Sequence, residues 1–112
     1  AVATATALDI TKSHLTRIGI YDLFDSIVSA KNVAHGKPAP DVYLYACEQI
    51  GERPQDCMAV EDSPNGILAA YTAGLRTVMV PDLTGPDEEL SKYLYGCVSS
   101  LPDICELAER EL

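Results

Sequence analysis

Short apolar segments alternate with helix-forming segments along the whole 112-residue chain, and this alternation constrains the fold more than any other feature. Segment 57–60 is a continuous apolar run typical of a strand covered on both faces, and 77–80 is a second buried strand. Strands that alternate with helices favour a parallel sheet, because right-handed crossovers lay helices over its faces. The sequence therefore predicts an α/β protein: a three-layer, Rossmann-like parallel sheet with helices on both faces.

The boundaries of the expected elements follow from turn residues, capping residues and glycines. Thr6 or Asp9 is expected to cap the first helix, and Ser63 the third, with Pro64 at its first position. The expected strands are 1–4, 26–29, 57–60, 77–80 and 97–99; the expected helices are 8–18, 41–50, 64–73, 87–93 and 102–112.

Charge and hydropathy exclude several classes of partner. The net charge is −9, with 5 basic and 7 acidic residues up to Val60, and 3 basic and 10 acidic residues from Glu61 onward. Such a chain repels phosphate backbones and anionic lipid, so we expect neither nucleic acid nor membrane as a partner. No apolar run approaches the roughly 18 residues that a membrane-spanning helix needs.

The four cysteines form no C-x-x-C pair, which disfavours a zinc site or a redox dithiol. Cys47 and Cys57 lie in patterns of a core helix and a core strand, so we expect buried, reduced thiols. Reduced thiols favour a cytoplasmic location.

Three groups of residues that could bind a phosphate are expected near the carboxyl ends of strands, where ligands bind in open parallel sheets. They are Thr4 and Ala5, Lys37 at the entrance of a helix, and the pair Glu61 and Asp62. Carboxylates there need a positive partner, and Mg²⁺ takes one or two carboxylates together with substrate phosphate. Lys37 would face phosphate oxygens, with the Thr4 hydroxyl beside it. The pattern suits phosphoryl transfer.

Each of these residues also has a simpler interpretation. Lys37 alone would be a solvated lysine, Thr4 a strand former or cap, and Glu61 and Asp62 helix-capping or dipole-pairing acids. Among the other polar side chains, Tyr43, Tyr45 and Tyr71 are expected to pack in the interior. His14 is expected on the surface and His35 in an exposed loop, where a substrate contact is conceivable.

Three segments resemble a known family. VATAT, HGKPAPDVY and AVEDSPNGILAAYTAG are similar to the second, third and fourth motifs of haloacid dehalogenase-like hydrolases, most of all the beta-phosphoglucomutase-like phosphatases and mutases. The resemblance implies that Thr4 and the Ala5 N–H bind the phosphoryl group and that Lys37 neutralises its charge. It also implies that Asp62 is a Mg²⁺ ligand and Glu61 a second acidic contact to the metal.

The sequence departs from this family at one point: it has no D-x-D, the motif whose first Asp is the family's nucleophile. The family's helical cap is absent as well. We therefore interpret residues 1–112 as the C-terminal part of the core domain, beginning at a cut and inactive alone. The absent strand would lie between 1–4 and 57–60, leaving a gap that the missing N-terminal half or a swapped second copy would fill.

For the parent protein these features predict a magnesium-dependent phosphatase that acts on a small phosphorylated metabolite. Two alternatives stay open. One is a hexose-phosphate mutase of the beta-phosphoglucomutase type, which differs in cap residues that this chain lacks. The other is a truncated, non-catalytic phosphate-binding or interaction domain.

Overall fold

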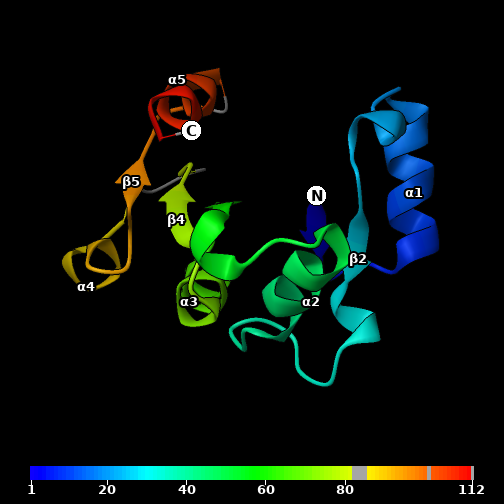
Figure 1. Cartoon of the computed structure of the whole chain (residues 1–112), viewed down its shortest axis with the longest axis horizontal. Coiled ribbons are helices and arrows are strands. Elements are labelled where there is room, and N and C mark those ends of the chain that lie inside the picture. The colour runs from blue at the N-terminus through cyan, green and yellow to red at the C-terminus, as the bar shows by residue number, and fades with distance from the viewer. Residues whose placement is uncertain (82–85, 101, 112) are drawn as a thin grey trace.

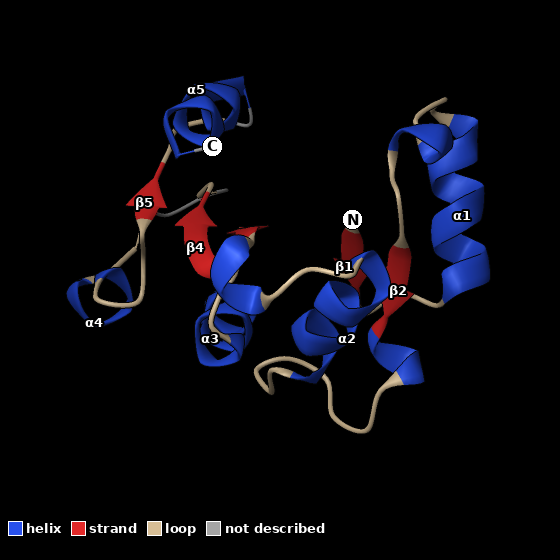
Figure 2. Cartoon of the chain, viewed as in Figure 1, coloured by secondary structure: helices blue, strands red, loops and turns tan. Residues whose placement is uncertain are grey.

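The computed structural model describes residues 1–81, 86–100 and 102–111. Within these residues, five short strands form two sheets, and every strand pair is parallel (Figures 1 and 2). One sheet pairs β1 (Val2–Thr4) with β2 (Ile27–Ser29). The other has the order β3-β4-β5, with bounds Met58–Glu61, Arg76–Met79 and Gly96–Cys97. The predicted α/β class with parallel strands is confirmed.

The helices follow the predicted order, with shifts at their ends. Their bounds are α1 Leu8–Arg17, α2 Asp41–Ile50, α3 Pro64–Ala73, α4 Glu88–Ser91 and α5 Pro102–Glu111. Three 3₁₀ turns cover Tyr21–Leu23, Ala30–Asn32 and Pro54–Asp56. The acidic helix is shorter than the predicted 87–93, and Leu112 lies outside the described residues. Over the described part of the chain, no helix has the length and apolarity to cross a membrane.

Helix capping was predicted correctly in one of two places. Ser63 accepts a hydrogen bond from the Gly66 N–H (3.2 Å) and so caps α3 as predicted. The capping prediction for α1 was wrong, because Ala7 occupies its N-cap position and no side chain caps it. Thr6 lies in the turn between β1 and α1, where its backbone N–H bonds the Thr4 hydroxyl instead.

The core forms where α2 and α3 pack against each other and against strands of both sheets. Small residues of α3, Ala69 and Ala70, are fully buried and let the two helices approach closely. Further core side chains come from α2, β2, β3 and the turn after α3; they include Val28, Val42, Ala46, Cys47, Ala59 and Leu75. This helix pair therefore joins two sheets that share no strand pairing. The packing prediction for Tyr71 was wrong, since its side chain is half exposed and meets Tyr93 edge to face.

Strands β1 and β3 each have one edge that no strand pairs with in the described part of the chain. The carbonyls of Cys57 and Glu61 accept hydrogen bonds from the N–H groups of Arg76 and Val80 on the β4 side. Because the backbone groups of successive strand residues point to opposite edges, those of Met58 and Val60 point away from β4. On β1, Val2 bonds Ser26 next to β2, which turns Ala3 outward. The expected split of the sheet at this point is confirmed.

Backbone hydrogen exchange should report this open edge. We expect the Met58 and Val60 amides to exchange faster than those of Arg76 and Val80, which are bonded to Cys57 and Glu61. Residue-resolved exchange by NMR measures all four in one sample. Equal protection of Met58 and Val80 at every protein concentration would contradict an open β3 edge.

Candidate functional site

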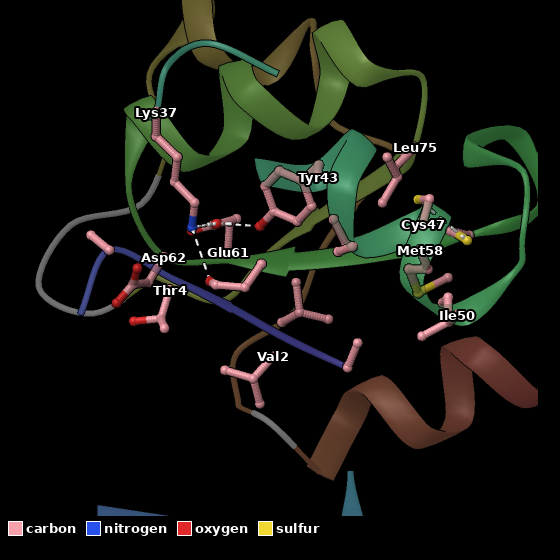
Figure 3. A pocket seen from close by; sticks show the side chains of 17 residues that line it. Val2, Thr4, Lys37, Tyr43, Cys47, Ile50, Met58, Glu61, Asp62 and Leu75 are labelled. Atoms are coloured by element: carbon pink, nitrogen blue, oxygen red, sulfur yellow. Dashed lines mark hydrogen bonds and ion pairs between the residues drawn. The ribbon is translucent and has the colours of Figure 1, made fainter. Parts of the chain in front are cut away.

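A groove of about 480 Å³ separates the open edges of β1 and β3 (Figure 3). Both strands run in the same direction along it, so their carboxyl ends meet at one end of the groove. Polar side chains gather at that end, and apolar side chains line the other together with Cys47, whose Sγ lies 3.8 Å from that of Cys57. The polar set is Thr4, Lys37, Glu61 and Asp62; the other set includes Val2, Cys47, Ile50, Cys57, Met58 and Leu75.

Lys37 bridges the two sheet edges. Its Nζ lies 2.5 Å from Glu61 Oε1 at the end of β3 and donates to the outward-facing carbonyl of Ala3 on β1 (3.4 Å). The loop that carries Lys37 is held at the start of α2, where the Asp41 carboxylate accepts the backbone N–H of His35 (3.2 Å). The side chain of Lys37 retains 20% of its exposure, so its ammonium is held in place but can still meet a ligand.

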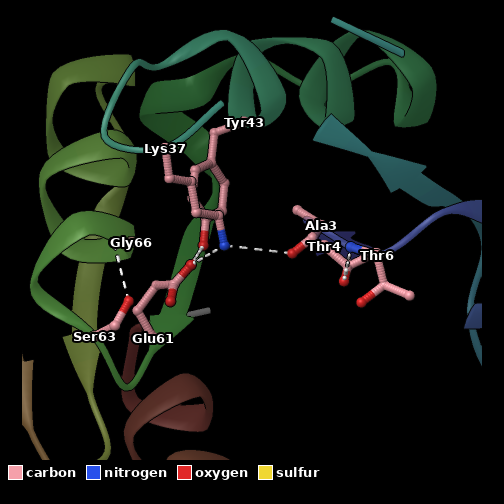
Figure 4. A network of polar contacts seen from close by, with 8 residues as sticks. All are labelled: Ala3, Thr4, Thr6, Lys37, Tyr43, Glu61, Ser63 and Gly66. Carbon is pink, nitrogen blue, oxygen red and sulfur yellow. Dashed lines mark hydrogen bonds and ion pairs between the residues drawn. The ribbon is translucent and has the colours of Figure 1, made fainter. Parts of the chain in front are cut away.

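The Glu61 carboxylate is more enclosed than the Lys37 ammonium, with 8% of its side chain exposed. Besides Lys37, Oε1 accepts a hydrogen bond from the hydroxyl of buried Tyr43 on α2 (Figure 4). The other oxygen, Oε2, lies against the Cα of Gly66 in the first turn of α3, where a Cβ would collide with it. Lys37, Tyr43 and Gly66 thus hold a carboxylate that would otherwise be costly to bury.

Thr4 ends β1, and Ala5 begins a turn that is tied to the neighbouring strand. Buried Ser29 at the end of β2 donates its hydroxyl to the carbonyl of Thr6 (2.7 Å). The Thr4 hydroxyl accepts the Thr6 N–H at 3.1 Å. A hydroxyl that accepts one bond can still donate another, so Thr4 keeps a donor for a phosphate oxygen. Ala5 is exposed beside it and lines the same groove.

Asp62 is exposed at the polar end of the groove, and the cap of α3 is formed by Ser63 rather than by Asp62. Its carboxylate is a hard oxygen ligand of the kind that Mg²⁺ binds, so this donor fits the metal. The described residues contain no group of three or more His, Cys, Asp or Glu side chains placed to hold a metal ion. Within this part of the chain, Asp62 and the engaged Glu61 are the carboxylates at the groove, and further ligands would be water and phosphate oxygens.

The structure brings together all five residues singled out from the sequence, since Thr4, Ala5, Lys37, Glu61 and Asp62 line one groove. Sequence reasoning missed two neighbours. Tyr43 was expected only to pack, but its hydroxyl bonds Glu61. Gly66 was not singled out, although its missing side chain makes room for that carboxylate. A tyrosine in a core helix is a usable signal, because buried hydroxyls normally find a partner. His14 and His35 are exposed, as predicted.

Residues 1–80 match the family model of haloacid dehalogenase-like hydrolases. Hexitol phosphatase B of Escherichia coli (strain K12) is 38% identical over 111 residues, which cover 99% of this chain and 49% of that protein.

Two solved structures superpose well. A haloacid dehalogenase-family hydrolase of Deinococcus radiodurans R1, with bound phosphate and sodium, has a TM-score of 0.81 at 29% identity over 97% of this chain and 51% of its own. Beta-phosphoglucomutase of Clostridium difficile has a TM-score of 0.72 at 27% identity, and the match covers 93% of this chain and 47% of that protein. The chain thus spans about half the length of these relatives.

Replacing Gly66 by alanine should dislodge the Glu61 carboxylate, because the new Cβ takes the space of Oε2. The lost contacts to Lys37 and Tyr43 should lower the free energy of unfolding by about 1–3 kcal/mol. Urea unfolding followed by circular dichroism measures it. Gly36→Ala is the control, since its Cβ would meet Ala30 at an ordinary 3.9 Å. Equal stabilities of the two variants would contradict this role of Gly66.

The thiols should differ in reactivity. All four cysteines are free; Cys47 is buried as expected, Cys57 is only half-buried, and Cys97 and Cys105 are exposed. Burial, followed by the neighbouring Cys57, raises the pKa of the Cys47 thiol to about 11. Because the thiolate is the nucleophile, iodoacetamide at about pH 8 should modify Cys97 and Cys105 well before Cys47. Peptide mass spectrometry gives the order, and early modification of Cys47 would contradict it.

Proposed function

This chain belongs to the haloacid dehalogenase-like hydrolases, and we propose that it is the C-terminal half of a magnesium-dependent phosphatase for a small phosphorylated metabolite. The nucleophilic aspartate lies outside these 112 residues, so the chain alone is inactive. The observation that carries the proposal is the Lys37 ammonium held between two open strand edges, with Thr4 and Asp62 beside it. The name of hexitol phosphatase B, which matches almost the whole chain, supports this class of substrate.

The residues that line the groove have different roles toward the phosphoryl group, according to their charge. Lys37 offsets negative charge on the phosphoryl group and on the incoming carboxylate, which would otherwise repel each other. The Thr4 hydroxyl and the Ala5 N–H donate to phosphate oxygens and orient the group. Asp62 would hold Mg²⁺, with Glu61 near enough for a contact to its waters, and the bound ion would neutralise phosphate charge. Glu61 also keeps Lys37 at the mouth of the groove.

The groove is where we propose that the missing segment binds. A strand laid between β1 and β3 would pair with the outward backbone groups of Ala3, Met58 and Val60 and join the two sheets. Its carboxyl end would then lie beside Lys37, and an aspartate there would be within reach of the bound phosphoryl group. The strand would come from the N-terminal half of the same protein, or from a swapped second copy.

A chimera tests the proposal. In hexitol phosphatase B of E. coli, the matched 49% is replaced by this chain. We expect the chimera, but not the chain alone, to hydrolyse p-nitrophenyl phosphate and hexitol phosphates, and to lose this activity when EDTA removes Mg²⁺. Lys37→Met should lower kcat by about 100-fold or more. Lys31→Met, which removes an exposed lysine, should leave it unchanged.

Three results would refute the proposal: a folded chimera that binds Mg²⁺ but turns over no phosphate ester, full activity of Lys37→Met, or magnesium-dependent turnover by the chain alone. Phosphate binding without turnover in the chimera would instead support the non-catalytic alternative. Hydrogen exchange adds an independent reading, because the Met58 and Val60 amides should become protected in the chimera if a strand fills the groove.

A further inference from the structure

The Glu61 carboxylate is the point where three segments of the chain meet. Lys37 reaches it from the loop before α2, Tyr43 from α2 itself, and Gly66 from the first turn of α3 (Figure 4). Two donors converge on one oxygen, Oε1, while the other, Oε2, occupies the space that a Cβ on Gly66 would need. The carboxylate therefore has little freedom to rotate.

Tyr43 holds this carboxylate through its hydroxyl and also contacts Lys37 through its ring. The residue is 7% exposed, and the Lys37 Nζ lies 5.1 Å from the ring centroid, within the range of a cation–π contact. Burial first, and then the hydrogen bond to Glu61, raise the pKa of Tyr43 above its ordinary value. The hydroxyl thus remains a donor, which suits its bond to a carboxylate.

We propose that Tyr43 is a positioning residue: its hydroxyl and the backbone at Gly66 clamp Glu61, and the clamped carboxylate sets the position of the Lys37 ammonium at the groove. The part of this inference that concerns turnover rests on the proposed function. A lysine has four rotatable side-chain bonds, so one mobile ion-pair partner would leave its ammonium spread over many positions. A partner fixed by two other elements restricts it to one.

A purely structural role for Tyr43 makes a different prediction. If the ring alone matters, as core packing and a cation–π partner, then Tyr43→Phe keeps the ring and changes little. If the hydroxyl positions Lys37 through Glu61, the same variant releases the carboxylate. Tyr45→Phe is the matched control, since Tyr45 lies on the same helix and, among the described residues, its hydroxyl makes no side-chain hydrogen bond.

The first measurement needs no activity. Relaxation of the lysine NH₃⁺ groups by ¹⁵N NMR, in the 112-residue chain, reports how restricted each ammonium is. We expect Lys37 to be ordered in the wild type and to approach the mobility of exposed Lys31 in Tyr43→Phe, but not in Tyr45→Phe. Gly66→Ala should mobilise Lys37 as well, by moving the same carboxylate from the other side. An unchanged Lys37 in a folded Tyr43→Phe would overturn the proposal.

The second measurement uses the active chimera. Tyr43→Phe should lower kcat about tenfold with KM changed less than about twofold. A misplaced ammonium should destabilise the transition state more than it weakens substrate binding. In a Glu61→Ala background, Tyr43→Phe should have no further effect on kcat, since the two residues act through one contact. Additive losses would overturn the proposal.

The two measurements separate the two proposals. If the chimera is inactive but Lys37 becomes mobile in Tyr43→Phe, the proposed function fails and the positioning role stands. If the chimera is active and Tyr43→Phe changes neither Lys37 mobility nor kcat, the positioning role fails and the proposed function stands.

Discussion

The ion pair between Lys37 and Glu61 is the contact on which the rest of the site depends. It joins a loop before α2 to the end of β3, and the same ammonium reaches the Ala3 carbonyl on the other sheet. A largely buried pair of this kind gains stability only when its remaining hydrogen-bonding groups are satisfied. Tyr43 and the space at Gly66 meet that need, and no buried side-chain polar atom among the described residues lacks a partner.

This contact also spans a gap in the sheet. The two sheets are held together by the α2–α3 core on one side and by Lys37 at the polar end of the groove, and no strand pairing joins them among the described residues. Open strand edges are a known liability, since they invite another strand to pair. The polar end of the groove, however, presents an ammonium and carboxylates instead of apolar side chains. The proposed occupant is therefore a strand that brings its own negative charge to Lys37.

Much of the fold could be predicted from local patterns. The apolar run at 57–60, Ser63 before Pro64, and Gly74 after α3 correctly identify elements. The predicted cover on both faces of 57–60 was wrong, because Val60 is 40% exposed. Predictions failed where tertiary packing overrode these local patterns. No side chain caps α1. On α3, Tyr71 is exposed, whereas the preceding residue, Ala70, is buried in the core. Strand ends shifted by about one residue because pairing register, rather than composition, defines them.

The sequence by itself determined the α/β class, the family, and which five candidate residues would line one groove, because periodicity and motif spacing involve neighbouring positions. Only the tertiary structure decided how those residues act on one another. The pairing of Lys37 with Glu61 spans 24 positions, and the Tyr43 hydroxyl is directed at that carboxylate by the packing of α2. Such contacts depend on how elements distant in the sequence pack against each other, and no local sequence pattern specifies this packing. In the folded chain, Lys37 and Glu61 form an ion pair at the polar end of the groove between β1 and β3.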